Sequence, residues 1–324
     1  MPMSAAEFDL IARVRARMSA HEDVVLGIGD DAAVLRMPPG RQLVVAMDTL
    51  NAGVHFPEDT APADIGWKAL AVNLSDLAAM GAEPAWCTLS LSLPAADAAW
   101  LDGFLDGFLA LSALHGVALV GGDTTRGPLS VCVTAHGCIE PRAALRRDGA
   151  RSGDDVWVTG TLGDAAGALR QWQAGAVRDA LLRARLDRPT PRVAAGRALL
   201  GLAHACIDVS DGLLADLGHI CRSSGVSAEI DIDALPASDA LRAAFAGDDL
   251  RLLQAAGGDD YELCFTAPRT ARAMVEDAMQ DVDVPVTRIG RVLRDDQSGR
   301  HVRVAALNGV PWLPPCEGYV HFSD

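Results

Sequence analysis

Hydrophobic residues recur along the chain with two different periods, which predict both helices and strands. Apolar positions at helical spacing predict helices over residues 5–19, 62–80 and 100–111. Residues 88–93 alternate apolar and polar side chains with period two, which predicts a half-buried strand. Shorter apolar runs predict the other strands of the first half at residues 43–47, 117–120 and 130–139.

The second half continues this mixture of elements. Apolar runs bounded by turn residues predict strands at residues 155–159, 206–208, 228–232, 261–266, 284–293 and 301–307. Helices are predicted over 211–222 and 268–281, after Gly163, and on both sides of the strand 206–208. We therefore expect an α/β (α+β) protein with domains at residues 1–140 and 154–324, joined by the arginine-rich linker 141–153.

Two glycines and two adjacent carboxylates meet in the segment Gly27–Ala32, whose sequence is GIGDDA. Its spacing also fits the loose dinucleotide-binding pattern G-x-G-x-x-A. That pattern cradles an anionic pyrophosphate at the start of a helix, whereas here Asp30 and Asp31 occupy the place of the anion and a short strand follows. Paired carboxylates on a tight turn suit a divalent metal ion, and a solvated hairpin tip is the alternative.

Carboxylates placed after a strand or a glycine pair recur along the chain. They are found at Asp48, Asp123, Asp208, Asp211, Asp259 and Asp260, and Asp76 lies on the apolar helix 62–80. Because the ends of strands in one sheet lie together, we expect several of these side chains to converge. Oxygen-only ligands suit Mg²⁺, so the pattern predicts a phosphoryl-transfer site with several Mg²⁺ ions. Zinc is disfavoured, because the eight histidines show no metal-ligand spacing.

Four candidate residues have structural alternatives. Asp76 could instead act as a cap or pair with an arginine, because a buried unpaired carboxylate costs several kcal/mol. Ser210 and Asp211 are also suitable N-caps for the helix 211–222. His55 lies beside Phe56 and Pro57, where a lone histidine is more often structural.

The charge balance narrows the class of ligand. The net charge of −15 argues against a nucleic-acid partner, which would favour a basic surface. Lys68 is the only lysine and lies in the sequence Gly-Trp-Lys-Ala, so the P-loop pattern G-x-x-x-x-G-K-[ST] is absent. An acidic protein can still bind phosphorylated ligands when metal ions lie between the negative charges.

Cysteine usage and hydropathy bear on the compartment. The seven cysteines form no C-x-x-C pair and mostly lie inside apolar runs, which is typical of buried thiols in a reducing cytosol. The N-terminal residues lack the apolar core of a signal peptide, and no stretch approaches the ~18 uncharged apolar residues of a membrane span. We therefore expect a cytoplasmic protein without a membrane partner.

Six motifs together resemble a known family. In chain order they are GIGDDAAVL, MDTLNAGVHF, GWKALAVNLSDLAAMGAEP, VGGDTTRG, IDVSDGLLADLGHI and GGDDYELCF. The set resembles the thiamine-monophosphate kinases, in the family of aminoimidazole ribonucleotide synthase and selenophosphate synthetase, over residues 7 to about 322. The resemblance implies an N-terminal mixed sheet with helices that pairs in a homodimer, and a C-terminal α/β domain that completes the active-site cleft.

The resemblance also implies three sets of site residues. Mg²⁺ would be held by Asp30, the backbone of Met47, Asp48, Asp76, Asp123, Asp208 and Asp211. ATP would lie against Gly122, Asp123, Arg147 and Ser210, with Asp123 and Arg147 positioning it and stabilising charge. Thiamine monophosphate would lie against His55, Tyr319 and either Asp259 or Asp260. The chain departs from the family at Ala46, where a hydroxyl ligand is usual, and at Asp259, where glutamate is usual.

The implied reaction is direct in-line phosphoryl transfer from ATP to thiamine monophosphate, the last step of thiamine diphosphate biosynthesis. Three alternatives are a selenophosphate synthetase, a dehydrogenase and a non-catalytic protein that binds Mg²⁺ and nucleotide. A selenophosphate synthetase is expected to carry a reactive cysteine near the N-terminal glycine turn, and the first cysteine here is Cys87. The strand that follows Gly29 counts against a dehydrogenase.

Overall fold

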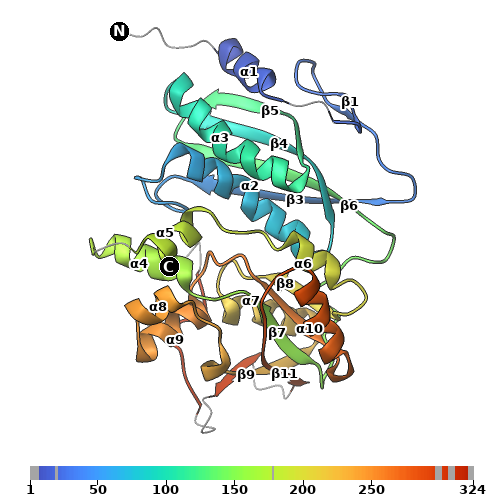
Figure 1. Ribbon diagram of the computed structural model, residues 1–324, viewed down its shortest axis with the longest axis vertical. Coiled ribbons are helices and arrows are strands. Elements are labelled where there is room, and N and C mark those ends of the chain that lie inside the picture. The colour runs from blue at the N-terminus through green and yellow to red at the C-terminus, as the bar shows by residue number, and fades with distance from the viewer. Residues whose placement is uncertain (1–6, 19–20, 177–178, 296–300, 306–310, 320–324) are drawn as a thin grey trace. The chain divides into compact units, whose positions relative to one another are not determined.

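A computed structural model describes residues 7–18, 21–176, 179–295, 301–305 and 311–319 (Figure 1). The chain forms two compact units, one from residues 1–77 and 82–142 and the other from residues 78–81 and 143–324. The change of unit after Arg142 falls inside the segment 141–153. Within the described residues, no helix is both long and apolar enough to cross a membrane.

The first unit is built on a four-stranded mixed sheet in the order β3-β6-β4-β5. Its strands are β3 (Gln42–Asn51), β4 (Glu83–Leu93), β5 (Ala118–Arg126) and β6 (Ser130–Ile139). β6 pairs antiparallel with β3 and β4, whereas β4 and β5 are parallel. One face is covered by α2 (Pro62–Ala79) and α3 (Ala98–His115) (Figure 1). The unit also contains α1 (Glu7–Ala16) and a small antiparallel sheet of β1 (Val24–Leu26) and β2 (Val34–Leu35).

Two glycines allow α2 and α3 to pack with their backbones in contact. A Cβ atom at Gly107 would lie 1.7 Å from the carbonyl oxygen of Ala63, and one at Gly66 would lie 2.0 Å from that of Phe104. Both helices are strongly apolar, and Leu74 is fully buried. The apolar pattern over residues 62–80 therefore gives a helix that is buried against the sheet and against α3.

The second unit contains a six-stranded mixed sheet in the order β12-β9-β11-β7-β10-β8. Its strands are β7 (Asp155–Thr159), β8 (Ala205–Asp208), β9 (Val226–Asp231), β10 (Leu263–Ala267), β11 (Val286–Arg294) and β12 (Val302–Ala305). Neighbours are antiparallel except β12 and β9. Its helices are α4 (Asp164–Gln173), α5 (Ala180–Asp187), α6 (Val193–Ala198), α7 (Leu213–Ser224), α8 (Asp239–Ala244), α9 (Gly247–Ala256) and α10 (Arg272–Asp281). The main core of this unit joins α7 to the sheet through side chains such as Leu217 and Ile207.

The predicted mixture of helices and mixed sheets is confirmed, but β5 is longer than predicted. The strand predicted at 117–120 continues to Arg126, so Asp123 lies inside a strand and not in a glycine turn. Gly122 is required at this point, because a Cβ atom there would lie 1.8 Å from the Leu89 carbonyl oxygen of β4. The glycine pair therefore marks a close approach of two strands, which the sequence alone does not distinguish from a turn.

Other boundaries also differ. The sequence predicts that Asp48 follows the strand 43–47, but β3 continues past it to Asn51. Two helices, α8 and α9, are not predicted, and α8 is only six residues long. Residues 306–307 of the predicted strand 301–307 lie outside the described residues.

Candidate active site

In the first unit, the Gly27–Ala33 segment and the strands β4 and β5 line a cavity of about 810 Å³. Asp30, Gly122 and Asp123 all lie on its wall. The turn is fixed locally, because the backbone N–H of Asp31 donates to Oδ1 of Asp30 at 2.9 Å. Three of the residues predicted to bind ATP and metal ions are therefore brought around one cavity.

The helix α2 positions two further predicted metal ligands. Asn73 is fully buried, and its Oδ1 accepts a hydrogen bond from the backbone N–H of Asp48 at 2.9 Å. Its amide nitrogen donates to the carbonyl oxygen of Ala69 at 3.0 Å, which fixes the orientation of the amide. Asp76 lies one turn further along the same helix. The backbone of β3 at Met47 and Asp48 is thereby fixed to α2.

The sheet does not bring Asp48 and Asp123 together, contrary to the expected convergence. Asp48 pairs with Val133 of β6, Val133 with Leu89 of β4, and Leu89 with Gly122 of β5. Strands lie about 4.8 Å apart, so three spacings separate the two edge strands by roughly 14 Å. One chain alone therefore does not join these two carboxylates.

His55 lies in the turn that follows β3, and its ring is held by that turn. The backbone N–H of Asn51 donates to Nδ1 of His55 at 2.9 Å. The ammonium of Lys68, on α2, donates to the His55 carbonyl oxygen at 2.9 Å. Both the ring and the backbone of this predicted substrate residue are therefore fixed.

In the second unit, Asp216 organises the loop that follows β8. Its Oδ2 accepts hydrogen bonds from the backbone N–H groups of Ser210, Asp211 and Gly212, each at 3.1 Å. The N-cap of α7 is Gly212, so the alternative that Ser210 and Asp211 cap this helix is wrong. The loop instead directs its N–H groups at Asp216, because this buried carboxylate needs donors.

The pKa of Asp216 reflects its burial and the charges around it. Its pKa is raised to about 7, first by burial and then by the negative charges of Asp208 and Asp211, although the N–H groups of Gly212 and Asp211 act in the opposite direction. The carboxylates of this loop are therefore close enough to repel one another. Repulsion of this kind favours the binding of a cation.

Three separate segments of the second unit meet at this loop. The backbone N–H of Asp259 donates to the carbonyl oxygen of Ser210 at 2.9 Å, and that of Tyr319 donates to the carbonyl oxygen of Asp211 at 2.9 Å. The hydroxyl of Tyr261 donates to Oδ1 of Asp259 at 3.0 Å. The structure thus brings together predicted residues for metal, ATP and substrate.

Asp260, the neighbour of Asp259, is turned into the protein. Both of its carboxylate oxygens accept from the backbone N–H of Gly163, at 2.8 and 3.0 Å, and burial raises its pKa well above the usual value. Asp259 has a φ of 68°, so the backbone turns sharply between the two side chains. Asp260 therefore fixes the start of α4, and only Asp259 lies beside Ser210.

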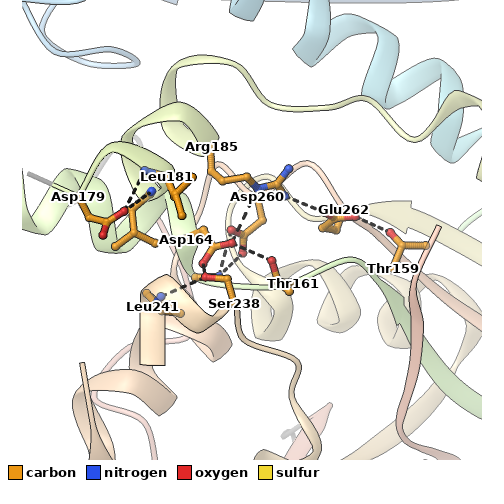
Figure 2. A network of polar contacts seen from close by, with 12 residues as sticks. Thr159, Thr161, Asp164, Asp179, Leu181, Arg185, Ser238, Leu241, Asp260 and Glu262 are labelled. Carbon is orange, nitrogen blue, oxygen red and sulfur yellow. Dashed lines mark hydrogen bonds and ion pairs between the residues drawn. The ribbon is translucent and has the colours of Figure 1, made fainter. Parts of the chain in front are cut away.

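A polar network continues from Asp260 into the unit (Figure 2). Glu262 is fully buried and accepts from Oγ1 of Thr159 at 2.7 Å and from Nη2 of Arg185 at 2.7 Å. Arg192 donates to both oxygens of Glu262 at 2.6 Å. Glu262 follows Asp259 in the chain, so this network fixes the segment on the C-terminal side of Asp259.

Arg147 and its neighbour Arg146 have different surroundings. Arg146 forms two hydrogen bonds with Asp148, at 2.6 and 2.8 Å. Arg147 is exposed, and its carbonyl oxygen accepts from the hydroxyl of Ser224 at 2.9 Å. Arg147 is therefore the arginine of this pair whose guanidinium is better placed to bind an anionic ligand.

The donor atoms in both units suit Mg²⁺. Asp30 and Asp123 share a cavity in the first unit, and Asp208 and Asp211 lie near each other in the second. No group of three or more His, Cys, Asp or Glu side chains is arranged to hold a metal ion within the described residues. Each carboxylate pair fits Mg²⁺, which binds one or two carboxylates and takes its other ligands from water and phosphate.

Comparison with known proteins identifies the family. Two models match, the AIR synthase related protein N-terminal domain over residues 29–139 and the corresponding C-terminal domain over residues 151–303. The thiamine-monophosphate kinase of Salmonella typhimurium is 48% identical, over 99% of each chain. The crystal structure of the thiamine-monophosphate kinase from Stenotrophomonas maltophilia is 57% identical, covers 93% of this chain and 97% of that chain, and has a TM-score of 0.86. The chain belongs to the thiamine-monophosphate kinase family.

A second solved structure is AaThiL complexed with AMPPCP and TMP. It is 32% identical, covers 98% of this chain and 97% of that chain, and has a TM-score of 0.76. The family and the fold expected from the six sequence motifs are therefore confirmed.

Family motifs do not single out two of the acidic residues that organise the site. Asp216 and Glu262 each lie inside an apolar run, in LLADLGHI and in YELCF. A carboxylate in such a run must find donors when it is buried, and that signal could have found both. The arginine partners of Glu262, such as Arg192, come from distant parts of the sequence and could not be read from it.

Proposed function

We propose that this chain transfers a phosphoryl group from ATP to thiamine monophosphate, which yields ADP and thiamine diphosphate. The observation that carries the proposal is the full-length likeness to AaThiL complexed with AMPPCP, an ATP analogue, and TMP. The thiamine-monophosphate kinases of Salmonella typhimurium and Stenotrophomonas maltophilia support it over nearly the whole chain. The cavity that holds Asp30 and Asp123 agrees with a site for a nucleotide and its metal ions.

We assign the site residues in three groups. The metal ions would be held by Asp30, the backbone of Met47, Asp48, Asp76, Asp123, Asp208 and Asp211. ATP would contact Gly122, Asp123, Arg147 and Ser210. Thiamine monophosphate would contact His55, Asp259 and Tyr319. Asp260 is left out of the substrate set, because both of its carboxylate oxygens already accept from Gly163.

The chemistry requires positioning more than proton transfer. The acceptor is a phosphate oxygen that is already anionic at pH 7, so no general base is needed. The obstacle is the repulsion between two polyanions, which Arg147 reduces by supplying positive charge. Bound Mg²⁺ would supply the remaining charge neutralisation at the phosphates. We infer direct transfer, so a phosphorylated aspartate found after incubation with γ-labelled ATP would contradict the mechanism.

We also propose that two copies pair through the first unit. The face of β3 opposite α2 presents three apolar side chains, Leu43, Val45 and Met47, which are 49, 55 and 63% exposed. A contiguous apolar row of this kind is typical of an interaction surface. Asp48 and Asp123 lie on the two edge strands of one sheet, and a second copy would supply both edges again.

A cytoplasmic location is also proposed. All seven cysteines lie among the described residues and are unpaired there. Burial raises the pKa of the Cys221 thiol to about 12, which keeps it protonated and unreactive. Reducing conditions suit such a set of thiols.

The test is a panel of acceptor substrates. ADP release would be measured with thiamine monophosphate, selenide or the aminoimidazole precursor, each with and without Mg²⁺. We expect release only with thiamine monophosphate and Mg²⁺. Release with selenide instead would favour a selenophosphate synthetase, and no release with any acceptor would contradict a kinase and favour a binding protein.

A further inference from the structure

Lys68 is the only lysine of the chain and is 1% exposed. Taking an ammonium group out of water costs several kcal/mol, so a buried lysine needs well-placed acceptors. One acceptor is the carbonyl oxygen of His55, at 2.9 Å from Nζ. The buried cation of α2 is therefore bonded to the turn that carries a proposed substrate residue.

The turn also holds the backbone of His55 through its N–H group. The N–H of His55 donates to the carbonyl oxygen of Asn51 at 3.0 Å, and the N–H of Gly53 donates to that of Phe56 at 3.1 Å. Gly53 has a φ of 74°, which favours glycine at this position. With Lys68 on its carbonyl group and Asn51 on its N–H group, the peptide backbone at His55 is fixed in both directions.

The same turn selects the tautomer of the imidazole. Because the backbone N–H of Asn51 donates to Nδ1 of His55 at 2.9 Å, Nδ1 carries a lone pair. The proton of the neutral ring is therefore on Nε2. In this tautomer Nε2 is the N–H donor of the ring, and a phosphate oxygen is an acceptor for such a group.

Two side chains of α2 form hydrogen bonds with the backbone of β3 and of the turn that follows it. Asn73 accepts from the backbone N–H of Asp48, and Lys68 donates to the backbone carbonyl group of His55. Both contacts reach the backbone, so they set the path of β3 and its turn independently of the side chains that bind ligands. One rigid helix therefore determines the positions of a proposed metal ligand and a proposed substrate ligand.

We propose that Lys68 is a positioning residue that holds the His55 turn, so that the imidazole presents Nε2–H to the phosphate of the acceptor substrate. The proposal rests on the proposed function for the identity of that substrate. Beyond that function, the proposal names Nε2 as the donor atom of His55 and Lys68 as the residue that keeps this atom in place.

The first test is a double-mutant cycle on Lys68 and His55. Lys68→Met keeps a side chain of similar length and a good helix former in an apolar setting, so we expect α2 to form. We expect Lys68→Met to raise the KM for thiamine monophosphate roughly tenfold and to leave the KM for ATP nearly unchanged. In a His55→Ala background, Lys68→Met should have no further effect, because the ring it positions is gone. An equal loss in both backgrounds would overturn the proposal.

A matched control separates positioning from loss of stability. Val72→Ala removes buried atoms from the same helix, and valine offers no donor to the His55 carbonyl group. Its melting temperature should fall while the KM for thiamine monophosphate stays at the wild-type value. A rise in that KM equal to the rise in Lys68→Met would show that destabilised α2, and not Lys68, causes the effect.

The second test needs no substrate. Nitrogen NMR of ¹⁵N-histidine-labelled protein, with the His55 signal assigned by His55→Ala, should show a single Nε2–H tautomer in the wild type and a mixture in Lys68→Met. An unchanged tautomer in Lys68→Met would overturn the positioning role whatever the activity. If the tautomer changes but wild-type protein does not release ADP with thiamine monophosphate, the positioning role stands and the proposed function fails.

Discussion

Asp259 and Asp260 are neighbours in sequence with opposite surroundings. Asp260 is 2% exposed and bonded to Gly163, whereas Asp259 accepts from the hydroxyl of Tyr261 and lies beside Ser210. The motif alone leaves open which of the two would contact substrate. Burial and hydrogen-bond partners favour Asp259 as the proposed substrate residue.

Among single residues, Asp123 is the one whose substitution tests the cavity of the first unit, and the variant is Asp123→Asn. The substitution keeps the size of the side chain and removes its charge, so binding of a hard cation should weaken. We expect kcat/KM for ADP release to fall by roughly 10²–10³-fold, with cooperative unfolding retained. Asp106→Asn is the control, because its side chain is 67% exposed and pairs with Arg17 at the surface. An unaltered rate in Asp123→Asn would remove this residue from the metal set.

Glu262→Gln tests the buried ion network. Glu262 is the common acceptor of Arg185 and Arg192, and removing its charge leaves two guanidinium groups without their buried counter-ion. We expect the free energy of unfolding to fall by about 3–5 kcal/mol in urea titrations.

The control for Glu262→Gln is Glu229→Gln. Glu229 pairs with Arg291 at the surface, where side chains are 36 and 58% exposed. Removing such a pair should change the free energy of unfolding by about 0–1 kcal/mol. Similar losses in the two variants would mean that the buried network does not stabilise the second unit.

At the scale of elements, the contact between α2 and α3 depends on glycine. Gly107→Ala would place a Cβ atom 1.7 Å from the carbonyl oxygen of Ala63, so the helices must separate. We expect a loss of about 1–3 kcal/mol in the free energy of unfolding, although alanine is the better helix former by about 1 kcal/mol.

Gly103→Ala on the same helix is the matched control for Gly107→Ala. Its Cβ atom would lie 3.3 Å from the Cβ atom of Pro62, which a small shift accommodates. Its stability should stay within about 1 kcal/mol of the wild type. A Gly107→Ala protein as stable as Gly103→Ala would mean that the two helices are not held at backbone contact.

The elements that were predicted correctly are those whose signal is local. The apolar periodicity over residues 62–80 predicts α2, and the alternation over residues 88–93 predicts the core of β4. The glycine pair 121–122 predicts a turn, whereas the structure requires glycine at Gly122 because Leu89 of another strand approaches its backbone. Contacts between distant segments decide such cases, and one sequence does not contain them.

The candidate site also has features that the sequence predicts and features that it does not. The acidic positions and their order in the chain can be read from the motifs. The separation of Asp48 and Asp123 follows from the strand order β3-β6-β4-β5, which periodicity does not give. The role of Lys68 depends on a hydrogen bond to a backbone atom 13 residues away, and no residue pattern predicts it.

At the scale of the whole molecule, the apolar row on β3 predicts the oligomeric state. A dimer should have twice the chain mass of 33.9 kDa in light scattering. Val45→Asp places a charge in the row and should give monomers, whereas Leu181→Asp, at an exposed position of α5, should leave the dimer intact. Val45→Asp protein that still elutes as a dimer would exclude this face as the interface.

A net charge of −15 makes the protein a poor binder of polyanions unless cations intervene. We propose that bound metal ions allow it to transfer a phosphoryl group between two anionic substrates. This proposal is tested by the yield of thiamine diphosphate per ADP, measured by chromatography of the products formed from ATP and thiamine monophosphate. We expect one thiamine diphosphate for each ADP with Mg²⁺ and neither product without it. ADP release without thiamine diphosphate would contradict it.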